Sequence, residues 1–262
     1  MAFDDLRVLD RVSFRLAHGE MIVVTGVSGS GKSVLMRLAC GLERPIAGEV
    51  LLEGRDISHL DEEALLELRG KLTGFVFQQN ALFTGMSVFD NTAFRLVEHG
   101  WTPERIERAA AEILTFVGLE QDVEKLPEEL SIGMRRRLEI ARALVGWPPI
   151  MLYDEPTSGL DPINSHQVLD LVIRARDVHH VSSLYVTKEM HEIPYLARHR
   201  SIEDADGSIR VVAEPPGSAL RILLLDEGRV EFAGSAEELL ESRLPVALHM
   251  THPEMERIGR HV

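Results

Sequence analysis

The chain has 262 residues, of which 45% are hydrophobic, and it carries a formal net charge of −14. This apolar content is sufficient for a stable core, the single cysteine excludes a disulfide within the chain, and the negative charge argues against nucleic acid as a partner. No run approaches the roughly 20 apolar residues that span a bilayer, and the N-terminus lacks a basic, apolar secretory signal, so we expect a cytoplasmic protein without direct membrane insertion.

The first predicted elements surround a glycine-rich segment. Alternating apolar residues at 12–16 predict a half-buried edge strand, and the apolar run 21–24 predicts a buried one. A helix-forming stretch follows at 34–39. Between the last two lies the sequence GVSGSGKS, which consists of Gly26, Val27, Ser28, Gly29, Ser30, Gly31, Lys32 and Ser33. This order of strand, glycine-rich loop and helix predicts a phosphate-binding P-loop.

The residue types in this loop have chemical reasons. Glycines let backbone N–H groups turn inward toward an anion, and the following helix points its positive end at the same place. Lys32 is expected to reach the β- and γ-phosphates, and Ser33 to place its hydroxyl on Mg²⁺. A chance glycine-rich turn does not account for the full match between strand and helix. The loop therefore predicts binding of a nucleoside triphosphate.

Later strands and helices alternate in the pattern of an α/β domain. Strands are predicted at 48–54, 73–78, 150–154 and 183–187, and the last two are continuous apolar runs of the buried parallel type. From 87 to 144 the pattern is only helical, with a helix start at Thr102-Pro103.

Turn signals at Asp206-Gly207 and Pro215-Pro216 predict a surface hairpin over about 201–219, and Ser235 opens a last helix through a capping box. We expect an α/β core over about 1–86 and 145–240, an inserted helical subdomain over about 87–144, and a C-terminal tail over 241–262 without a usable pattern.

Two carboxylates, Asp154 and Glu155, end the strand at 150–154. Ligands of an open α/β sheet bind at the carboxyl edge of its strands, so both acids should face the P-loop phosphates. Asp154 is expected to hold the Mg²⁺ shell, and Glu155 to polarise an attacking water. An isolated Asp-Glu pair is usually a solvated turn, but its position after a buried strand in a P-loop protein favours a functional pair.

These residues resemble the ATP-binding subunits of ABC transporters over about 3–240. The sequence LSIGM at 130–134, with the RRRLEIARAL that follows it, is similar to the family signature LSGGQ and its helix. Gln78 stands where the family has its Q-loop glutamine, Asp161 ends a match to the D-loop, and Phe3 stands where an aromatic ring stacks on adenine. The resemblance implies a P-loop NTPase of the ABC ATPase type, with a mostly parallel core sheet, N-terminal antiparallel strands and an inserted helical subdomain.

The resemblance also implies how such a chain works. Two copies would dimerise head to tail and sandwich ATP between the P-loop of one and the signature of the other. Ser131 and Gly133 would contact the γ-phosphate across that interface. Gln78 would join Ser33 and Asp154 around Mg²⁺, and Asp161 would belong to the catalytic set. Hydrolysis would move an integral membrane permease, with this chain peripheral on the cytoplasmic face of the membrane.

A narrower resemblance lies in the segment 77–91, which is similar to the Q-loop region of the Mla-type, Mce-associated ATPases that energise phospholipid transport. Met134 in place of the usual glutamine fits that subfamily. The segment also contains an apolar cluster where a permease helix would dock, or which is core of the helical subdomain. Its members are Leu82, Phe83, Met86 and Phe89.

The sequence departs from the family pattern at three places. Ile132 replaces the first signature glycine and would be strained if that position needs a positive φ. The stretch at 201–219 has no counterpart in a minimal subunit. Lys188 stands where the family has a switch histidine, and it can contact the γ-phosphate or pair with Glu155 and quench it; His191 lies nearly one helical turn further on.

Three functions follow from these patterns. The first is a transport ATPase, for phospholipid or, as an importer subunit, for another substrate, with slow hydrolysis because of Lys188. The second is a nucleotide-gated, hydrolysis-poor subunit of a membrane complex. The third is a soluble ABC ATPase of repair or translation, which would carry a long coiled-coil insertion or two fused cassettes.

Overall fold

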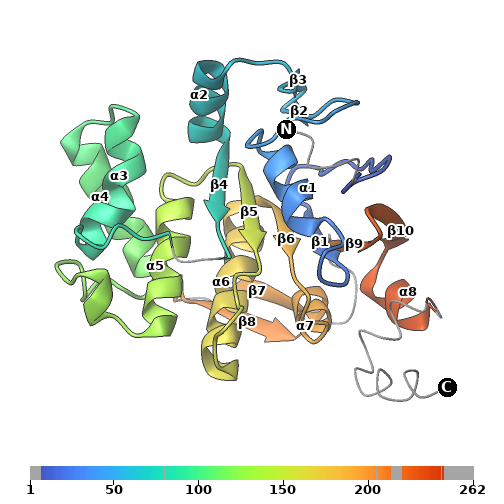
Figure 1. Cartoon of the computed structure of the whole chain (residues 1–262). Helices are drawn as coiled ribbons and strands as arrows, with labels where there is room; N and C mark the ends of the chain where they lie inside the picture. Colours follow the sequence, from blue (N-terminus) through green and yellow to red (C-terminus); the bar gives the residue numbers. More distant parts are fainter. Residues whose placement is uncertain (1–6, 79–80, 205, 214–219, 243, 245–262) are drawn as a thin grey trace.

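The structure is a computed structural model that describes residues 7–78, 81–204, 206–213, 220–242 and 244. Within these residues the main sheet has six strands in the order β10-β9-β1-β6-β5-β4, and only the pair β9–β10 is antiparallel (Figure 1). Their bounds are β1 Met21–Thr25, β4 Thr73–Val76, β5 Ile150–Asp154, β6 Ser182–Val186, β9 Leu220–Asp226 and β10 Arg229–Gly234. The expected mostly parallel core sheet is confirmed.

Some of the helices cover the sheet, and the others form a separate group beside β4 (Figure 1). That group consists of α3, α4 and α5, which fill the stretch where the sequence pattern is only helical. The bounds are α1 Lys32–Ala39, α2 Glu62–Leu72, α3 Val88–Glu98, α4 Pro103–Val117, the 3-10 helix η1 Pro127–Glu129, α5 Ile132–Leu144, α6 Pro162–His179, α7 Glu192–Arg198 and α8 Ala236–Glu241. The division of the chain into core, helical subdomain and tail stays a prediction.

Alternate residues of the buried strands enter two different apolar clusters. In β1, Ile22 and Val24 pack with Leu35 and Met36 of α1, whereas Val23 packs with residues of α5, α6 and α7 on the other face. Successive strand side chains point to opposite faces, so a continuous apolar run is what a sheet covered on both sides requires. Each large side chain buried in this way contributes about 1.5–3 kcal/mol to folding.

Two of the predicted strands differ in the structure. The expected strand at 12–16 is wrong: its apolar residues face a core cluster, but the segment joins no sheet among the described residues. The expected strand at 48–54 is reduced to β2 Leu51–Leu52, which pairs with β3 Arg55–Asp56. Glu53 and Gly54 both have positive φ, so the chain turns back directly after Leu52 as a tight hairpin.

The predicted hairpin near 201–219 consists of β7 His199–Glu203 and β8 Ile209–Ala213, with a turn that includes Gly207. It is anchored on α6, where Arg176 donates to the His199 carbonyl at 2.9 Å and Asp177 accepts from the Ser201 N–H at 2.7 Å. The Pro215-Pro216 signal lies outside the described residues. No helix in the described part of the chain is long and apolar enough to cross a membrane.

Candidate functional site

Four loops meet at one edge of the sheet and carry the predicted catalytic residues. The strands β1, β6, β5 and β4 are parallel neighbours, so their carboxyl ends lie side by side. The P-loop follows β1, Lys188 follows β6 and Glu155 follows β5 directly. Gln78 lies two residues beyond β4, instead of ending the strand as expected. The topology therefore brings residues more than 150 positions apart into one site.

The P-loop is closely packed against the sheet and folded around its own lysine. Gly26 has φ +149°, and a Cβ there would lie 2.1 Å from the Leu225 carbonyl oxygen, so only glycine fits. Lys32 donates from Nζ to the carbonyl oxygens of Gly26 at 2.8 Å and Val27 at 2.9 Å. Burial lowers the pKa of this lysine. The ammonium is thus held beside the loop that is predicted to bind phosphates.

The groups beside the loop fit an anionic ligand with a divalent cation. Among the described residues, the buried hydroxyl of Ser30 has no hydrogen-bond partner, and it belongs to the predicted phosphate loop. Ser33 donates from Oγ to Asp154 Oδ1 at 3.3 Å, which places two of the three predicted Mg²⁺ ligands together. Burial raises the pKa of Asp154, although the Ser33 hydrogen bond opposes this. A cation between these oxygens would favour the ionised carboxylate.

Glu155 is held by two side chains from neighbouring loops. Its Oε2 accepts from Gln78 Nε2 at 3.1 Å and lies 3.0 Å from Lys188 Nζ. The hydrogen bond and the charge of Glu155 together raise the pKa of Lys188. The Glu155 side chain is only 13% exposed, and its backbone has φ +47°, in the left-handed region. The pairing of Lys188 with Glu155, one of the two possibilities read from the sequence, is present.

The signature residues begin α5 and contact α6. Ser131 caps α5 by accepting from the Met134 N–H at 3.2 Å, and Ile132 is 62% exposed without a positive φ, so it is not strained. A Cβ on Gly133 would lie 1.8 Å from Asn164 Oδ1. Asp161 caps α6, and the hydrogen bonds from Asn164 lower its pKa. Signature and D-loop are therefore packed together within one chain.

The basic run at 135–137 forms internal hydrogen bonds. Arg136 is 9% exposed; it donates to the carbonyl oxygens of Phe77 at 3.0 Å and Gln78 at 3.3 Å, and to Glu139 at 2.6 Å. Arg142, six residues further along α5, donates to the Ala81 carbonyl. The sequence did not indicate this role. The connection that carries Gln78 is thus fixed to the helix that begins at the signature.

The predicted docking cluster is only partly on the surface. Phe83 is 39% exposed, with its ring 4.6 Å from that of Phe94 and the Arg142 guanidinium above it at 5.1 Å. Leu82 packs against the main core, and Met86 and Phe89 are half-buried. Phe3, the predicted adenine-stacking residue, lies outside the described residues.

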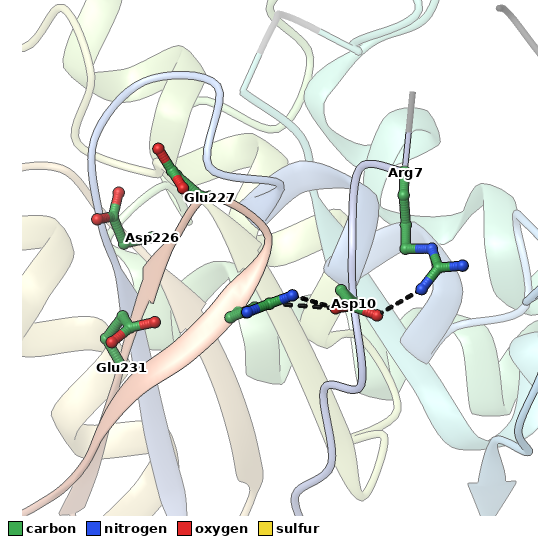
Figure 2. Close-up of a pocket in the computed structure, with 6 residues that line it drawn as sticks. Arg7, Asp10, Asp226, Glu227 and Glu231 are labelled. Atoms are coloured by element: carbon green, nitrogen blue, oxygen red, sulfur yellow. Dashed lines mark hydrogen bonds and ion pairs between the residues drawn. The ribbon is translucent and has the colours of Figure 1, made fainter. Parts of the chain in front are cut away.

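An open hollow of about 400 Å³ lies beside the turn between β9 and β10. Figure 2 shows Asp10 on its wall, where the carboxylate accepts from Arg7 at 2.8 Å and from Arg229 at 2.7 Å. These two hydrogen bonds lower the pKa of Asp10. Asp226, Glu227 and Glu231 also line the hollow. None of the predicted site residues that the structure describes lines it, so the hollow is separate from those residues. The Asp10–Arg229 pair joins the N-terminal segment to the hairpin of β9 and β10.

A buried carboxylate that the sequence pattern did not single out lies behind the site. Glu192, the first residue of α7, is 1% exposed. It accepts hydrogen bonds from the Thr157 hydroxyl and, at 3.0 Å, from the Tyr185 hydroxyl. Its neighbours on the helix, Ile193 and Leu196, are buried, so a glutamate at this apolar spacing is the signal that identifies it.

Known proteins share both the sequence and the fold. The ABC transporter family model matches residues 9–158. The methionine import ATP-binding protein of Carboxydothermus hydrogenoformans is 38% identical over 199 residues, which are 76% of this chain and 59% of that protein. The glycine betaine/carnitine transport ATP-binding protein of Listeria monocytogenes is 36% identical over 207 residues, 79% of this chain and 52% of that protein. The chain thus spans only about half to three fifths of these two relatives.

Solved structures agree. A dimeric ATP-binding cassette in a post-hydrolysis state with ADP and Pi has a TM-score of 0.74 and 27% identity, over 90% of this chain and 94% of that one. A second dimeric bacterial ABC transporter cassette has a TM-score of 0.75 over the same shares. Because the family model covers more than half of the sequence and the fold matches known cassettes, the chain belongs to the ABC transporter family.

Proposed function

We propose that this chain is the ATP-binding and ATP-hydrolysing subunit of a membrane transporter. The observation that carries the proposal is the juxtaposition at one sheet edge of the P-loop, the Ser33–Asp154 pair and Glu155 with its two partners. Membership of the family supports it. The names of the relatives indicate a role in transport. The substrates in those names belong to the relatives and are not assigned to this chain.

Each residue then has a proposed role toward ATP and Mg²⁺. The P-loop from Gly26 to Ser33 binds the phosphates through its N–H groups, and Lys32 exchanges its present carbonyl partners for phosphate oxygens. Ser33, Asp154 and Gln78 hold Mg²⁺, which supplies charge neutralisation at the phosphates. Glu155 accepts a proton from the attacking water.

Slow hydrolysis is part of the proposal, because the Lys188 ammonium forms an ion pair with Oε2 of Glu155, the carboxylate that is to act on the attacking water. A lysine cannot accept a hydrogen bond as histidine can. Loss of a positioned orienting group costs about 10²–10⁴ in rate, and typical enzymes turn over about 10 times per second. We therefore expect a turnover of about 0.1 per second or less, with ATP binding retained. This also supports the second candidate, a nucleotide-gated subunit that binds and releases a membrane complex with little turnover.

Steady-state ATPase assays of the purified chain, beside Lys188→His, test this rate. The histidine variant is expected to be at least tenfold faster at an unchanged affinity for ATP. Lys71→Met is the matched control, since Lys71 forms an exposed ion pair with Glu67 at 2.5 Å and lies on α2. Turnover near 10 per second that Lys188→His does not raise would disprove the slow-site proposal. Absence of ATP binding would disprove the function itself.

The proposed partner across the nucleotide is a second copy of the chain. The matched solved cassettes are dimers, which supports a sandwich in which Ser131 and Gly133 of one copy meet ATP bound to the other. Asp161 would lie at the same interface, and Phe3 would stack on adenine. Size-exclusion chromatography of Glu155→Gln with and without ATP tests this, and a monomer at saturating ATP would contradict it.

The permease is proposed to dock near Phe83 and the half-buried Leu82, Met86 and Phe89, with the chain on the cytoplasmic face of the membrane.

The transported molecule has two candidates. The similarity of residues 77–91 to Mla-type ATPases favours phospholipid, while the names of the relatives above favour import of a small solute such as an amino acid. Co-purification in mild detergent, with mass spectrometry of bound proteins and lipids, decides between them. A permease with a lipid-binding partner supports the first, and an amino-acid permease the second.

A further inference from the structure

The buried carboxylate of Glu192 bridges the two loops that carry Glu155 and Lys188. Thr157, which donates to Glu192 Oε1, lies two residues after Glu155. Tyr185, which donates to Oε2 at 3.0 Å, lies on β6 three residues before Lys188. Glu192 itself follows Lys188 by four residues. The ion pair Lys188–Glu155 and the contact Glu192–Thr157 therefore join the same two loops at two separate points.

A residue that only filled space would not need the carboxylate of Glu192. Among the described residues no lysine, arginine or histidine pairs with Glu192; its two partners are neutral hydroxyls, and both of these residues are also buried. Removing a carboxylate from water without a countercharge is costly, and an apolar residue of similar volume would avoid that cost. The carboxylate instead joins two groups that an apolar side chain could not join, since each of its oxygens accepts a hydrogen bond from one of the two hydroxyls.

The backbone from Thr187 to Glu192, which carries Lys188, is fixed at both ends. At its start, the Thr187 N–H donates to the Val24 carbonyl at 3.1 Å, and the Glu189 N–H donates to the Thr187 hydroxyl at 2.9 Å. At its end, Glu192 is bound to Thr157 and Tyr185. Lys188 lies between the two anchors, 43% exposed at its side chain. The Glu192 bridge is thus one of the contacts that hold this backbone beside Glu155, together with the hydrogen bond from the Glu155 N–H to the Val186 carbonyl at 3.0 Å.

We propose that Glu192 is a positioning residue for ATP hydrolysis: through Thr157 and Tyr185 it sets the distance between the Glu155 carboxylate and residue 188. The inference rests on the proposed function, in which these two side chains act on ATP. Glu192 would act through its two neighbours, since each of its carboxylate oxygens accepts a hydrogen bond from one of their hydroxyls. It holds the two loops in a fixed position relative to each other, and small displacements of reacting groups lower the rate of a reaction strongly.

The kinetic test compares Glu192→Gln with the full chain and with Tyr195→Phe. Tyr195 is the matched control, because it also donates from α7 to a carboxylate, Asp170, at 2.7 Å, but on the side of α6. We expect Glu192→Gln to lower kcat about tenfold, equivalent to ~1.4 kcal/mol, with KM changed less than twofold and Tyr195→Phe unchanged. Thr157→Val should give a similar loss, and the double variant no more than either single one. A kcat equal to that of the unmodified chain, or a loss shared by the control, would overturn the inference.

Hydrogen exchange measured by mass spectrometry gives a readout that needs no hydrolysis. We expect at least tenfold faster exchange over residues 187–191 in Glu192→Gln, while β1 and Tyr195→Phe stay as in the unmodified chain. If the unmodified chain bound no ATP or did not hydrolyse it, the proposed function would fail and this exchange result would alone decide the role of Glu192. Unchanged exchange in Glu192→Gln would reject it.

Discussion

Replacement of Gly133 by alanine should destabilise the single chain before any second copy or nucleotide is involved. The new Cβ would lie 1.8 Å from Asn164 Oδ1 and 2.4 Å from its Cγ, well inside the roughly 3.5 Å of atoms in contact. Asn164 cannot turn away freely, because its side-chain amide donates to Asp161, the cap of α6. Overpacking of this kind costs about 1–3 kcal/mol. In a chain of this size, each kcal/mol shifts Tm by about 2–4 °C.

Thermal unfolding without nucleotide measures this effect. Gly85→Ala is the control, because Gly85 has an ordinary φ and a methyl group on its Cα would meet no atom within 4 Å. Asn164→Ala removes the clash, and we expect the double variant Gly133→Ala/Asn164→Ala to be more stable than Gly133→Ala alone. Asn164→Ala by itself loses its hydrogen bond, worth about 1 kcal/mol. A Tm for Gly133→Ala equal to that of Gly85→Ala would refute the reasoning.

Three further outcomes are expected. Glu155→Gln should lower phosphate release about 10²–10⁴-fold with ATP affinity retained, and a smaller loss would mean that another group takes the proton. Because burial raises the pKa of Asp154, protonation begins at a higher pH than for an ordinary aspartate, so Mg²⁺-dependent ATP binding should weaken on acidification; calorimetry should find a smaller pH dependence in Asp154→Asn, which lacks this carboxyl. Ser87→Ala removes a capping box from α3 and should cost about 0.5–2 kcal/mol in thermal unfolding, more than Thr102→Ala, since Thr102 makes no cap hydrogen bond.

The fold was predictable where sequence pattern and burial coincide. The predicted strand 150–154 is β5 without change, because its residues up to Tyr153 are apolar, as a strand covered on both faces requires. Alternation at 12–16 predicted the buried face of that segment correctly, but not its pairing. Apolar residues at every second position indicate an extended chain with one buried side. A strand also requires a neighbour with free N–H and C=O groups, and the sequence contains no sign of that neighbour.

The residues of the site also divide into those that the sequence predicts and those that it does not. Lys32, Asp154 and Glu155 were identifiable because their chemistry is set by residues adjacent in the chain. The contact between Thr157 and Glu192 joins residues 35 positions apart, and that between Gly133 and Asn164 joins two different helices. Such contacts leave no periodic signal, and a glutamate or an asparagine alone is most often a solvated side chain. Only the packing of α5, α6 and α7 at the sheet edge reveals them.

At Glu155, where the backbone is left-handed, selection for folding and selection for catalysis favour different residues. A residue with a side chain at φ +47° carries a conformational penalty that glycine, and to a lesser degree asparagine, would avoid. Glutamate at this position therefore persists only while its carboxylate is useful. In a descendant lineage that kept nucleotide binding but abandoned cleavage, drift toward glycine or asparagine would stabilise the fold, so the residue found at this single position would record whether cleavage was still under selection.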